Sequence, residues 1–448
     1  MKDCFVVPPS AGLLAMTQDK MKTIKFYTLG CKVNQYDTQS IRERFLNKGF
    51  KEISNGKKAD FYLINTCTVT SVADRKSREI IRSCIKTNPR AKVLVTGCVV
   101  EKDVVSLLPI KGISSIIAKR FFPDGITDFS GHTRAFLKIQ DGCDNFCSYC
   151  KVPLVRGRSR SRPLKQIVHE ARKLSAQGFK EIVLTGICLG AYGRDFNRVI
   201  ASPAGAKQSC KKIASVASLP RNDITLVDLV KELEKIDGIA RIRLSSIEAK
   251  DVSLELIRTM AKSDKLCRHL HIPIQSGDDE ILKKMNRSYN SKYYLALIKK
   301  IKKIIPEIAI TTDVLVGFPG ESEDNFNNTL KLVKQIMPLR VHIFPYSKRE
   351  NTAAANFKDE ISPVVVRQRA ARLKKMAVSC SLVFRKKFLH KKIAVLIEGQ
   401  VKERPDFWEG YSDNYIKVLI KSNQNLKNRL ITLRIKKIEE NYLWGDFC

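Results

Sequence analysis

The feature of this 448-residue chain that most constrains its fold is a strand followed by a helix, repeated along most of its length. From about residue 134 the pattern predicts six strands separated by helical stretches: RAFLKIQ, EIVLTGI, ARIRLSS, CRHLHIPI, IAITTDVLVG and LRVHIFPY. Consecutive βα units of this kind favour an incomplete parallel (β/α)6 barrel. In such a barrel the reactive groups belong at the carboxyl ends of the strands.

Two further units are expected to flank this barrel. Residues 22–128 contain the strands KTIKFYTLG, FYLINTC and AKVLVTGC with helical stretches between them, which predicts an α/β domain with a parallel sheet. Residues 381–448 alternate in the manner of strands (KKIAVLIEGQV, NYIKVLI and LITLRIKKIE), which predicts a small β-barrel. The central domain would span residues 129–370.

Two stretches do not fit these units. Residues 1–21 resemble an unstructured extension, or the result of a start codon assigned too early, because Met21 precedes the first convincing strand. Residues 194–222 are rich in Ser, Ala and Lys without a clear period, which predicts a surface insertion into the central domain.

The chain is strongly basic, with 81 Lys and Arg residues against 45 Asp and Glu residues and a formal net charge of +36. A field of this sign attracts phosphate backbones and raises the rate of encounter with nucleic acid. The excess could also serve only to solvate a lysine-rich surface. No stretch reaches the roughly 18 apolar residues of a membrane span, and no convincing secretory signal is visible, so we expect a cytoplasmic protein without membrane contact.

Three cysteines stand in the string GCDNFCSYC, after the first strand of the predicted barrel. Cys143, Cys147 and Cys150 have the spacing Cys-x3-Cys-x2-Cys, and soft thiolates on one short loop suit an iron–sulfur cluster. Three thiolates on a four-iron cluster leave one iron open to a small molecule. A zinc knuckle is the alternative, but zinc sites usually close with four ligands, and no second pair of cysteines follows nearby.

Three more cysteines each stand at the end of a predicted strand in the N-terminal domain: Cys31 in YTLGC, Cys67 in LINTC and Cys98 in VLVTGC. Because the carboxyl ends of parallel strands meet at one edge of a sheet, we expect these thiols around one point, as a second three-thiolate cluster requires. The alternative is buried cysteines that act as small hydrophobes. Seven of the 13 cysteines lack partners at ligand spacing and are predicted not to bind metal: Cys4, Cys84, Cys188, Cys210, Cys267, Cys380 and Cys448.

The triple-cysteine loop, with Tyr149 before its third thiol, resembles the radical S-adenosylmethionine (SAM) superfamily, in which the open iron binds SAM. Residues 22–448 as a whole resemble the methylthiotransferases within it. In that family an N-terminal domain with three cysteines precedes a radical SAM partial barrel and a terminal RNA-binding TRAM barrel. The segments LTGICLGAYG, RLSSIE, HIPIQSG and TDVLVGFPGE also match, each at the end of a barrel strand.

The resemblance implies cofactors, partners and a reaction. The cofactors would be SAM and two four-iron, four-sulfur (4Fe–4S) clusters. The partners would be a tRNA anticodon loop, an electron donor such as flavodoxin or ferredoxin, and a sulfur donor. One SAM molecule would methylate sulfur at the second triad, and another would give a 5′-deoxyadenosyl radical at Cys143, Cys147 and Cys150. Radical chemistry suits this substrate because the C2–H of adenine reacts poorly with polar nucleophiles.

The string TLGCKVNQYDT resembles the branch that acts on N6-threonylcarbamoyladenosine at position 37 of tRNA, as does VPLVRGRSRSRP. The isopentenyladenosine branch, with a GCQMN-like string, and the branch that modifies a ribosomal-protein aspartate, with GCPKN, are alternatives. A third alternative is an RNA-binding protein whose clusters are structural or sense redox state. The two sets of three cysteines argue against this third alternative, because closed structural clusters generally have four protein ligands.

The matching strand-end segments contain the residues expected to line the SAM pocket: Gly186, Gly190, Gly193, Ser246, Glu248, Gln275 and Ser276. The glycines could let the backbone approach SAM, although loop glycines often serve turns. The Ser–Glu pair could bind the ribose or amino end of SAM, or be a solvated strand end. The Gln–Ser pair would contact the adenosine of SAM or the substrate base. His271 is more typical of a core histidine, and Asp313 of a pocket wall or a helix cap.

Two groups of residues are expected to contact RNA: Lys151, Arg156, Arg158, Arg160 and Arg162 beside the catalytic loop, and Trp408, Tyr411 and Tyr415 in the terminal barrel. Basic side chains near the loop would hold phosphates while a base enters the pocket. Aromatic side chains on a barrel would stack on bases of a single-stranded loop. The alternatives are a solvated loop and an ordinary barrel core. One departure from the family pattern is Lys151, where an apolar residue is more usual.

Overall fold

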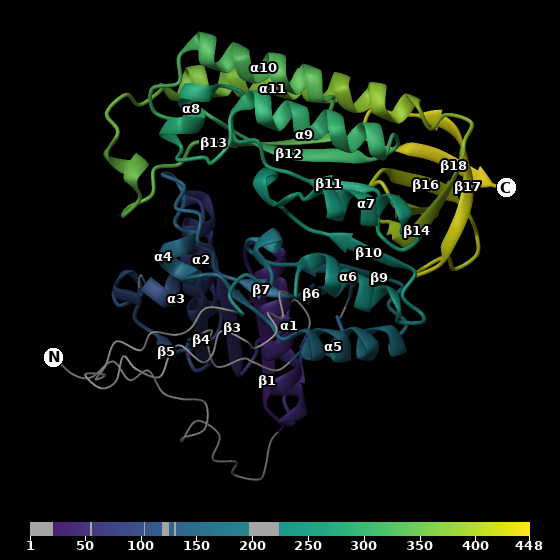
Figure 1. Cartoon of the computed structure of the whole chain (residues 1–448). Coiled ribbons are helices and arrows are strands. Elements are labelled where there is room, and N and C mark those ends of the chain that lie inside the picture. Colours follow the sequence, from purple (N-terminus) through teal and green to yellow (C-terminus); the bar gives the residue numbers. More distant parts are fainter. Residues whose placement is uncertain (1–20, 54–55, 103, 119–124, 130, 197–223) are drawn as a thin grey trace, which may run out of the picture.

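The computed structural model describes residues 21–448 except 54–55, 103, 119–124, 130 and 197–223. The predicted extension up to residue 20, and the predicted insertion from residue 197 on, lie outside the described residues. A parallel α/β sheet, a partial barrel and a closed β-barrel follow one another along the chain (Figure 1). The predicted fold class is therefore confirmed.

The N-terminal sheet is entirely parallel, with the order β2-β1-β3-β4-β5. Its strands are β1 (Thr23–Thr28), β2 (Lys51–Glu52), β3 (Phe61–Thr66), β4 (Lys92–Gly97) and β5 (Ile113–Ile116). The helices are α1 (Lys32–Asn47), α2 (Ser71–Thr87) and α3 (Cys98–Lys102). Every residue of β3 is buried, as expected for a central strand with both faces covered. The neighbouring ends of β1 and β3 lie where the strand order reverses, a position at which such sheets bind ligands.

The central unit is a six-stranded parallel barrel left open on one side. Its strands are β6 (Arg134–Lys138), β9 (Glu181–Thr185), β10 (Arg241–Leu244), β11 (His269–His271), β12 (Ala309–Val316) and β13 (Arg340–Pro345). Parallel ladders join the first three strands and the last three, and bridges from Ile242 to Leu266 and from Ser246 to His271 connect the two groups. Among the described residues, β6 and β13 each pair with one neighbour only. A short hairpin of β7 (Gln140–Asp141) and β8 (Arg160–Ser161) follows β6.

Helices cover the outside of these strands (Figure 1). They are α5 (Leu164–Ala176), α6 (Leu226–Glu234), α7 (Leu254–Lys262), α8 (Asp279–Lys284), α9 (Ser291–Ile304) and α10 (Glu323–Ile336), whereas the short α4 (Val152–Arg156) packs against α3. The sequence defines their starts: Thr225 and Asp228 form a capping box on α6, and Ser253 caps α7. Such caps contribute about 1 kcal/mol each. The apolar sides of the helices and strands form one continuous core.

Helix α11 (Pro363–Lys386) packs along α10 and β13 and leads into the terminal barrel (Figure 1). The barrel closes in the order β14-β15-β16-β18-β17. Its strands are β14 (Lys392–Val401), β15 (Arg404–Ser412), β16 (Lys417–Lys421), β17 (Leu430–Ile438) and β18 (Leu443–Phe447). Closure leaves no free strand edge.

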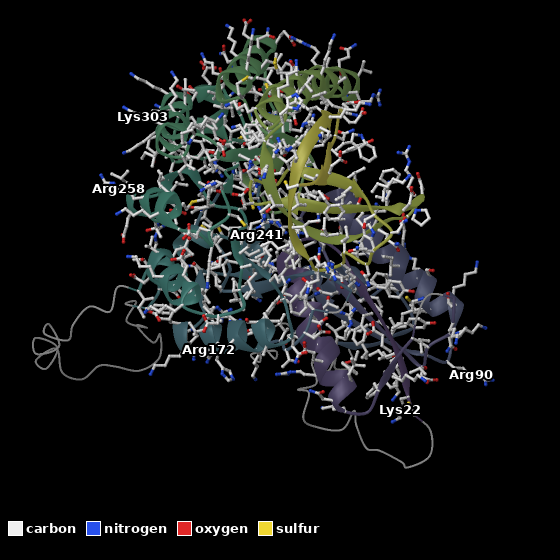
Figure 2. The ribbon with its side chains drawn as sticks, turned by 90° about the vertical axis from the view of Figure 1, so that its right-hand side faces the viewer. Lys22, Arg90, Arg172, Arg241, Arg258 and Lys303 are labelled. Atoms are coloured by element: carbon white, nitrogen blue, oxygen red, sulfur yellow. The ribbon has the colours of Figure 1, made fainter. Side chains whose placement is uncertain are left out.

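The terminal barrel covers the amino ends of the central strands. Arg241 donates to the carbonyl oxygens of Tyr411 at 2.9 Å and Ala394 at 2.7 Å, and Arg243 donates to those of Ser412 at 3.1 Å and Asp413 at 2.8 Å. Figure 2 shows Arg241 against this barrel. The carboxyl ends of the central strands, where barrel chemistry belongs, point the other way, and α1 of the N-terminal unit packs against β6. No described helix is long and apolar enough to cross a membrane.

Candidate functional site

The structure brings the three N-terminal strand-end cysteines to one edge. Cys31 precedes α1, Cys67 follows β3 and Cys98 begins α3, and β1, β3 and β4 are neighbours. Gly30 has a φ of +96°, and a Cβ there would lie 2.8 Å from the Cys67 Sγ. Only glycine fits this close approach. Cys31 is exposed while Cys67 and Cys98 are buried. Their role as cluster ligands stays a prediction.

The chemistry of this triad suits a metal cluster. Burial, with smaller contributions from the neighbouring Cys98 and Cys31 and against the effect of Arg156, raises the pKa of the Cys67 thiol to about 11. At neutral pH such a thiol keeps its proton, and a bound metal would displace that proton and leave a thiolate. A nearby buried cation then offsets part of the thiolate charge, so the residues present fit a cluster.

Arg156 links the N-terminal sheet to the barrel between the two triads. Its guanidinium donates to Asn34 at 2.5 Å and to Asp141 at 2.7 Å, and the side chain is 2% exposed. Lys138 completes the network with ion pairs of 2.7 Å to both Asp37 and Asp141. The predicted contact of Arg156 with RNA is therefore wrong: its charge is fully occupied inside the protein.

The second set of thiols lies on the loop after β7. Cys143 is buried, and Cys147 and Cys150 are partly buried. Burial raises the pKa of Cys150 to about 12. Arg287 approaches the Cys147 Sγ to 3.3 Å. Three sulfurs on one loop beside a buried guanidinium fit a cluster that is negatively charged through its thiolates.

Arg287 also forms an ion pair with Glu248 and donates to the Tyr289 hydroxyl at 2.9 Å. The structure thus places Glu248, one of the predicted SAM-pocket residues, beside the triple-cysteine loop. Arg287 itself was not predicted. It follows α8, far from any cysteine in the sequence, and no local pattern could have identified it.

Cys188 is a second residue that the sequence did not identify. Its Sγ lies 3.6 Å from the Asn145 Nδ2 and 3.6 Å from an Asp251 carboxylate oxygen. It also hydrogen-bonds Cys143, which lowers the pKa of Cys143 and raises that of Cys188. The prediction that Cys188 does not bind metal stays a prediction, but its contacts place it beside the triple-cysteine loop. The usable signal was its position after β9, equivalent to that of the N-terminal cysteines.

Within the described ranges, no three His, Cys, Asp or Glu side chains lie close enough to share a single metal ion. A four-iron cube spreads its ligands over separate corners, so it requires a wider arrangement than one ion does.

The remaining pocket candidates have different surroundings. A Cβ at Gly190 would lie 2.3 Å from the Asp251 Cβ, and one at Gly193 would lie 1.7 Å from the Ile224 carbonyl oxygen. A Cβ at Gly186 would lie 3.0 Å from a Gln140 oxygen. These glycines are explained by close packing within the protein, without a cofactor.

Ser276 is 1% exposed and its hydroxyl lies 3.3 Å from that of Thr329 on α10. It faces the outer helices, so its predicted contact with SAM is wrong. Gln275 adopts a φ of +67° and bridges to β12, and Ser246 bridges to His271. Both remain at strand ends on the side of the triads.

Polar side chains line the inner face of β11, β12 and β13. His271 Nε2 lies 3.2 Å from one Asp313 oxygen, and His342 Nδ1 lies 3.5 Å from the other. Thr311 bonds both His269 and His271 at 2.9 Å. His271, predicted as a core residue, thus belongs to this network, and Asp313 is a wall of the lumen.

Most of the residues predicted to contact RNA are buried or engaged in contacts within the protein. Arg158 and Arg160 are exposed, but Lys151 is buried, and Arg162 pairs with Glu170 at 2.7 Å. Trp408 is 6% exposed in the barrel core. Tyr411 and Tyr415 stack on each other, 5.1 Å apart, at the junction with the central barrel. Trp408 therefore packs inside the barrel, while contact of the half-buried Tyr411 and Tyr415 with RNA stays a prediction.

The basic side chains are distributed over several sides of the molecule. In Figure 2, Lys22 and Arg90 project from the N-terminal unit, Arg172 from α5, Arg258 from α7 and Lys303 from α9. This spread does not single out one docking face.

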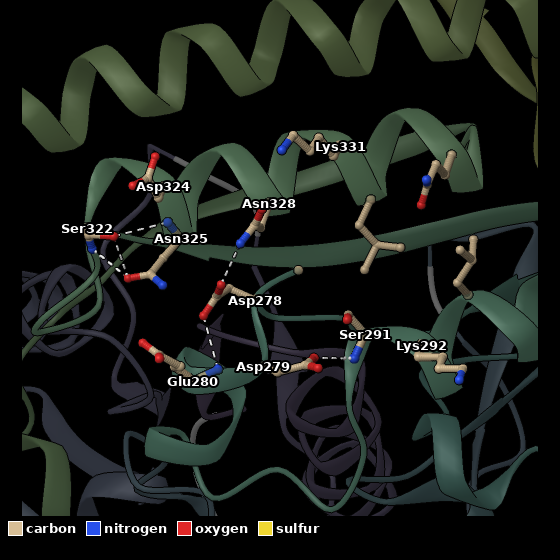
Figure 3. A pocket seen from close by; sticks show the side chains of 14 residues that line it. Asp278, Asp279, Glu280, Ser291, Lys292, Ser322, Asp324, Asn325, Asn328 and Lys331 are labelled. Carbon is tan, nitrogen blue, oxygen red and sulfur yellow. Dashed lines mark hydrogen bonds between the residues drawn. The ribbon is translucent and has the colours of Figure 1, made fainter.

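A cavity of about 780 Å³ lies among α8, α9 and α10, away from the cysteines (Figure 3). Its polar groups are engaged in helix caps. Asp278 accepts from the backbone of Glu280 at 3.0 Å and from Asn328 at 2.8 Å, and Ser322 and Asn325 bond each other. The cavity is therefore explained by helix ends.

The chain is similar to known proteins over nearly its whole length. It is 35% identical over 460 residues to the threonylcarbamoyladenosine tRNA methylthiotransferase MtaB of Bacillus subtilis (strain 168), covering 95% of this chain and 96% of that protein. It is 31% identical over 458 residues to the tRNA-2-methylthio-N(6)-dimethylallyladenosine synthase of Desulfitobacterium hafniense (strain Y51), covering 95% and 97%.

Two family models match separate parts of the chain. The Radical SAM superfamily matches residues 137–333, and the Uncharacterized protein family UPF0004 matches residues 23–118. Among solved structures, the radical S-adenosylmethionine methyltransferase TsrM from Kitasatospora setae aligns at 12% identity with a TM-score of 0.48, covering 75% of this chain and 77% of that one.

Proposed function

Because the chain belongs to the radical SAM tRNA methylthiotransferases, we propose that it adds a methylthio group to C2 of N6-threonylcarbamoyladenosine at position 37 of tRNA. Membership implies SAM and a 4Fe–4S cluster. The choice of base is supported by the TLGCKVNQYDT string and by the name of the Bacillus subtilis relative.

In this proposal Cys143, Cys147 and Cys150 hold the SAM-binding cluster, and Cys31, Cys67 and Cys98 hold a second one. When bound, the first supplies the electron that cleaves SAM to a radical, and the second carries the sulfur to be transferred. The protein contributes positioning: it holds two loops and a base at one point from which water is excluded.

The observation that carries the proposal is that buried contacts join the two segments that carry the thiol triads. Arg156, on the helix after the catalytic loop, bonds Asn34 on the helix after Cys31. Lys138 pairs with Asp37 and Asp141 across the same boundary. These contacts support the proposal that both triads face one space at the carboxyl ends of their strands.

The test uses anaerobically reconstituted protein with alanine at each cysteine. Changing Cys143, Cys147 or Cys150 should abolish 5′-deoxyadenosine formation. Changing Cys31, Cys67 or Cys98 should preserve SAM cleavage and stop methylthiolation. Cys380→Ala is the matched control, because that thiol lies on the buried face of α11, outside both triads. Normal methylthiolated product from a variant of the N-terminal triad would contradict the proposal.

Isopentenyladenosine is the second candidate substrate, favoured by the Desulfitobacterium hafniense relative. Nucleoside analysis of tRNA from a deletion strain distinguishes the two: loss of the methylthio form of threonylcarbamoyladenosine alone supports the first. The proposal also includes a cytoplasmic location, a reductant such as flavodoxin or ferredoxin, a sulfur donor, and a TRAM identity for the terminal barrel.

A further inference from the structure

The terminal barrel inserts one side chain, that of Tyr415, into the floor of the central barrel, at the amino ends of its strands. Tyr415, between β15 and β16, adopts a φ of +65°, a conformation that is costly for a bulky residue. Its ring packs against that of His269 at a tilt of 39°, with centroids 4.8 Å apart. The guanidinium groups of Arg243, Arg134 and Arg340 lie 4.7, 5.4 and 5.8 Å from the ring centre.

The carboxylates at this floor of the barrel, Glu181 and Glu398, are already paired with arginines. Glu181 pairs with Arg243 at 2.6 Å and lies 3.7 Å from Arg134 and 3.8 Å from Arg241. Glu398 pairs with Arg134. In the part of the chain that the structure describes, no carboxylate pairs with Arg340 or with Lys32.

Lys32 lies between the floor of the central barrel and the edge of the N-terminal sheet that carries Cys31, Cys67 and Cys98. It directly follows Cys31, is half-buried, and lies within the electrostatic reach of Tyr415, Arg134 and Arg243. Arg340 faces the same lumen, because it stands opposite Thr311 in the β12–β13 ladder, and Thr311 bonds the inward-pointing His269 and His271. Burial and the surrounding cations hold the pKa of His269 well below its ordinary value, so this ring is neutral at pH 7.

A lumen with two unpaired cations attracts an anion. Lys32 is half-buried and Arg340 is exposed to the open lumen, so both can reach an incoming anion, and charge-assisted hydrogen bonds to a carboxylate are among the strongest available. A carboxylate is also the group that separates the two candidate bases: the threonylcarbamoyl substituent carries one, and the isopentenyl substituent is a hydrocarbon.

We propose that Lys32, Arg340 and the Tyr415 hydroxyl form a subsite that binds the carboxylate on the N6 substituent of the substrate base. The inference rests on the proposed function and deepens it. It assigns the selection between the two modified adenines to the floor of the lumen. It also makes the terminal barrel part of the substrate pocket.

The test pairs two RNAs with two proteins. The RNAs are an anticodon stem–loop with threonylcarbamoyladenosine and the same stem–loop with the carboxylate replaced by a methyl group. The wild-type enzyme should show a kcat/KM about 10- to 100-fold higher for the charged RNA, the range expected for hydrogen bonds to a charged group. For Arg340→Gln and Lys32→Gln the ratio between the RNAs should fall toward one. Lys299→Gln, an exposed cation on α9, should keep the wild-type ratio.

Binding of both RNAs without SAM, followed by fluorescence anisotropy, gives a readout independent of turnover. Arg340→Lys should restore part of the preference, which a purely structural role would not produce. An equal loss of affinity for both RNAs in Arg340→Gln would overturn the subsite.

The two proposals fail differently. If the wild-type protein cleaves SAM but methylthiolates neither RNA, the proposed function is wrong. If it modifies both RNAs equally well, the function stands and the subsite is wrong.

Discussion

At the scale of single residues, Arg156 has the most demanding environment. Its side chain is 2% exposed and contacts Asn34 and Asp141, while Lys138 also pairs with Asp141. A buried ion pair contributes little net stability, but removing one partner leaves an uncompensated charge.

We expect Arg156→Gln to lower the free energy of unfolding by about 3–5 kcal/mol, because Asp141 and Asp37 lose a buried cation. Arg158→Gln, two residues away, should change it by less than about 0.5 kcal/mol, since that side chain is 66% exposed. Urea unfolding of the three proteins measures both values. Equal midpoints for the two variants would contradict the assigned network.

The sequence predicted the six triad cysteines because their spacing and strand-end positions are local features. It could not predict Arg156 as a buried link, since its partners Asn34 and Asp37 lie more than a hundred residues away. A run of arginines beside a loop has the same pattern whether it faces RNA or carboxylates. Arg287 was missed for the same reason, since Cys147 lies 140 residues away from it.

At the scale of elements, the candidate site depends on how strands end. Gly97 closes β4 with a φ of +105°, and a Cβ there would lie 2.3 Å from the Thr66 carbonyl oxygen. That oxygen belongs to the residue before Cys67, so the close approach positions two cysteine-bearing strand ends together.

Gly97→Ala should reduce iron bound by the N-terminal triad, because the β3 and β4 ends must separate to admit a methyl group. Gly49→Ala is the control: it has a φ of +80° but no atom within 4 Å of the new Cβ, so it tests backbone strain alone. Iron and sulfide content can be measured in a background where Cys143, Cys147 and Cys150 are alanine. Similar iron content in both variants would show that the close approach of Gly97 to Thr66 does not matter for iron binding.

Element types were predicted well, because periodic apolar patterns specify strands and helices directly. Which face of the terminal barrel lies inside was not predicted. Trp408 and Tyr415 were assigned to a surface, yet alternation along a strand is the same for either choice of interior. Only closure of the barrel, and its docking on β6 and β10, decides the question.

At the scale of the whole molecule, Glu181 holds the two barrels together. It is fully buried and pairs with Arg243, which also donates to the terminal barrel. Burial alone would raise the pKa of Glu181, but Arg243, Arg134 and Arg241 together hold it below its ordinary value.

A carboxyl whose pKa is lowered in the folded state stabilises that state above its unfolded pKa of about 4.3. This contribution should be lost as the pH falls below that value, through the lower pKa of the folded protein. Glu181→Gln should melt at a lower temperature at pH 7, because three arginines lose their partner, and its stability should depend less on pH in the acid range. Thermal melts from pH 3 to 7 test this; parallel profiles for both proteins would contradict it.

One of the three thiols at the N-terminal edge, Cys31, faces solvent while its companions are enclosed. Alkylating or oxidising reagents added to the metal-free chain will therefore reach that corner first. Damage during aerobic handling should begin with one modified side chain and leave a protein that is still folded but has lost one of the three thiols proposed to hold the second cluster.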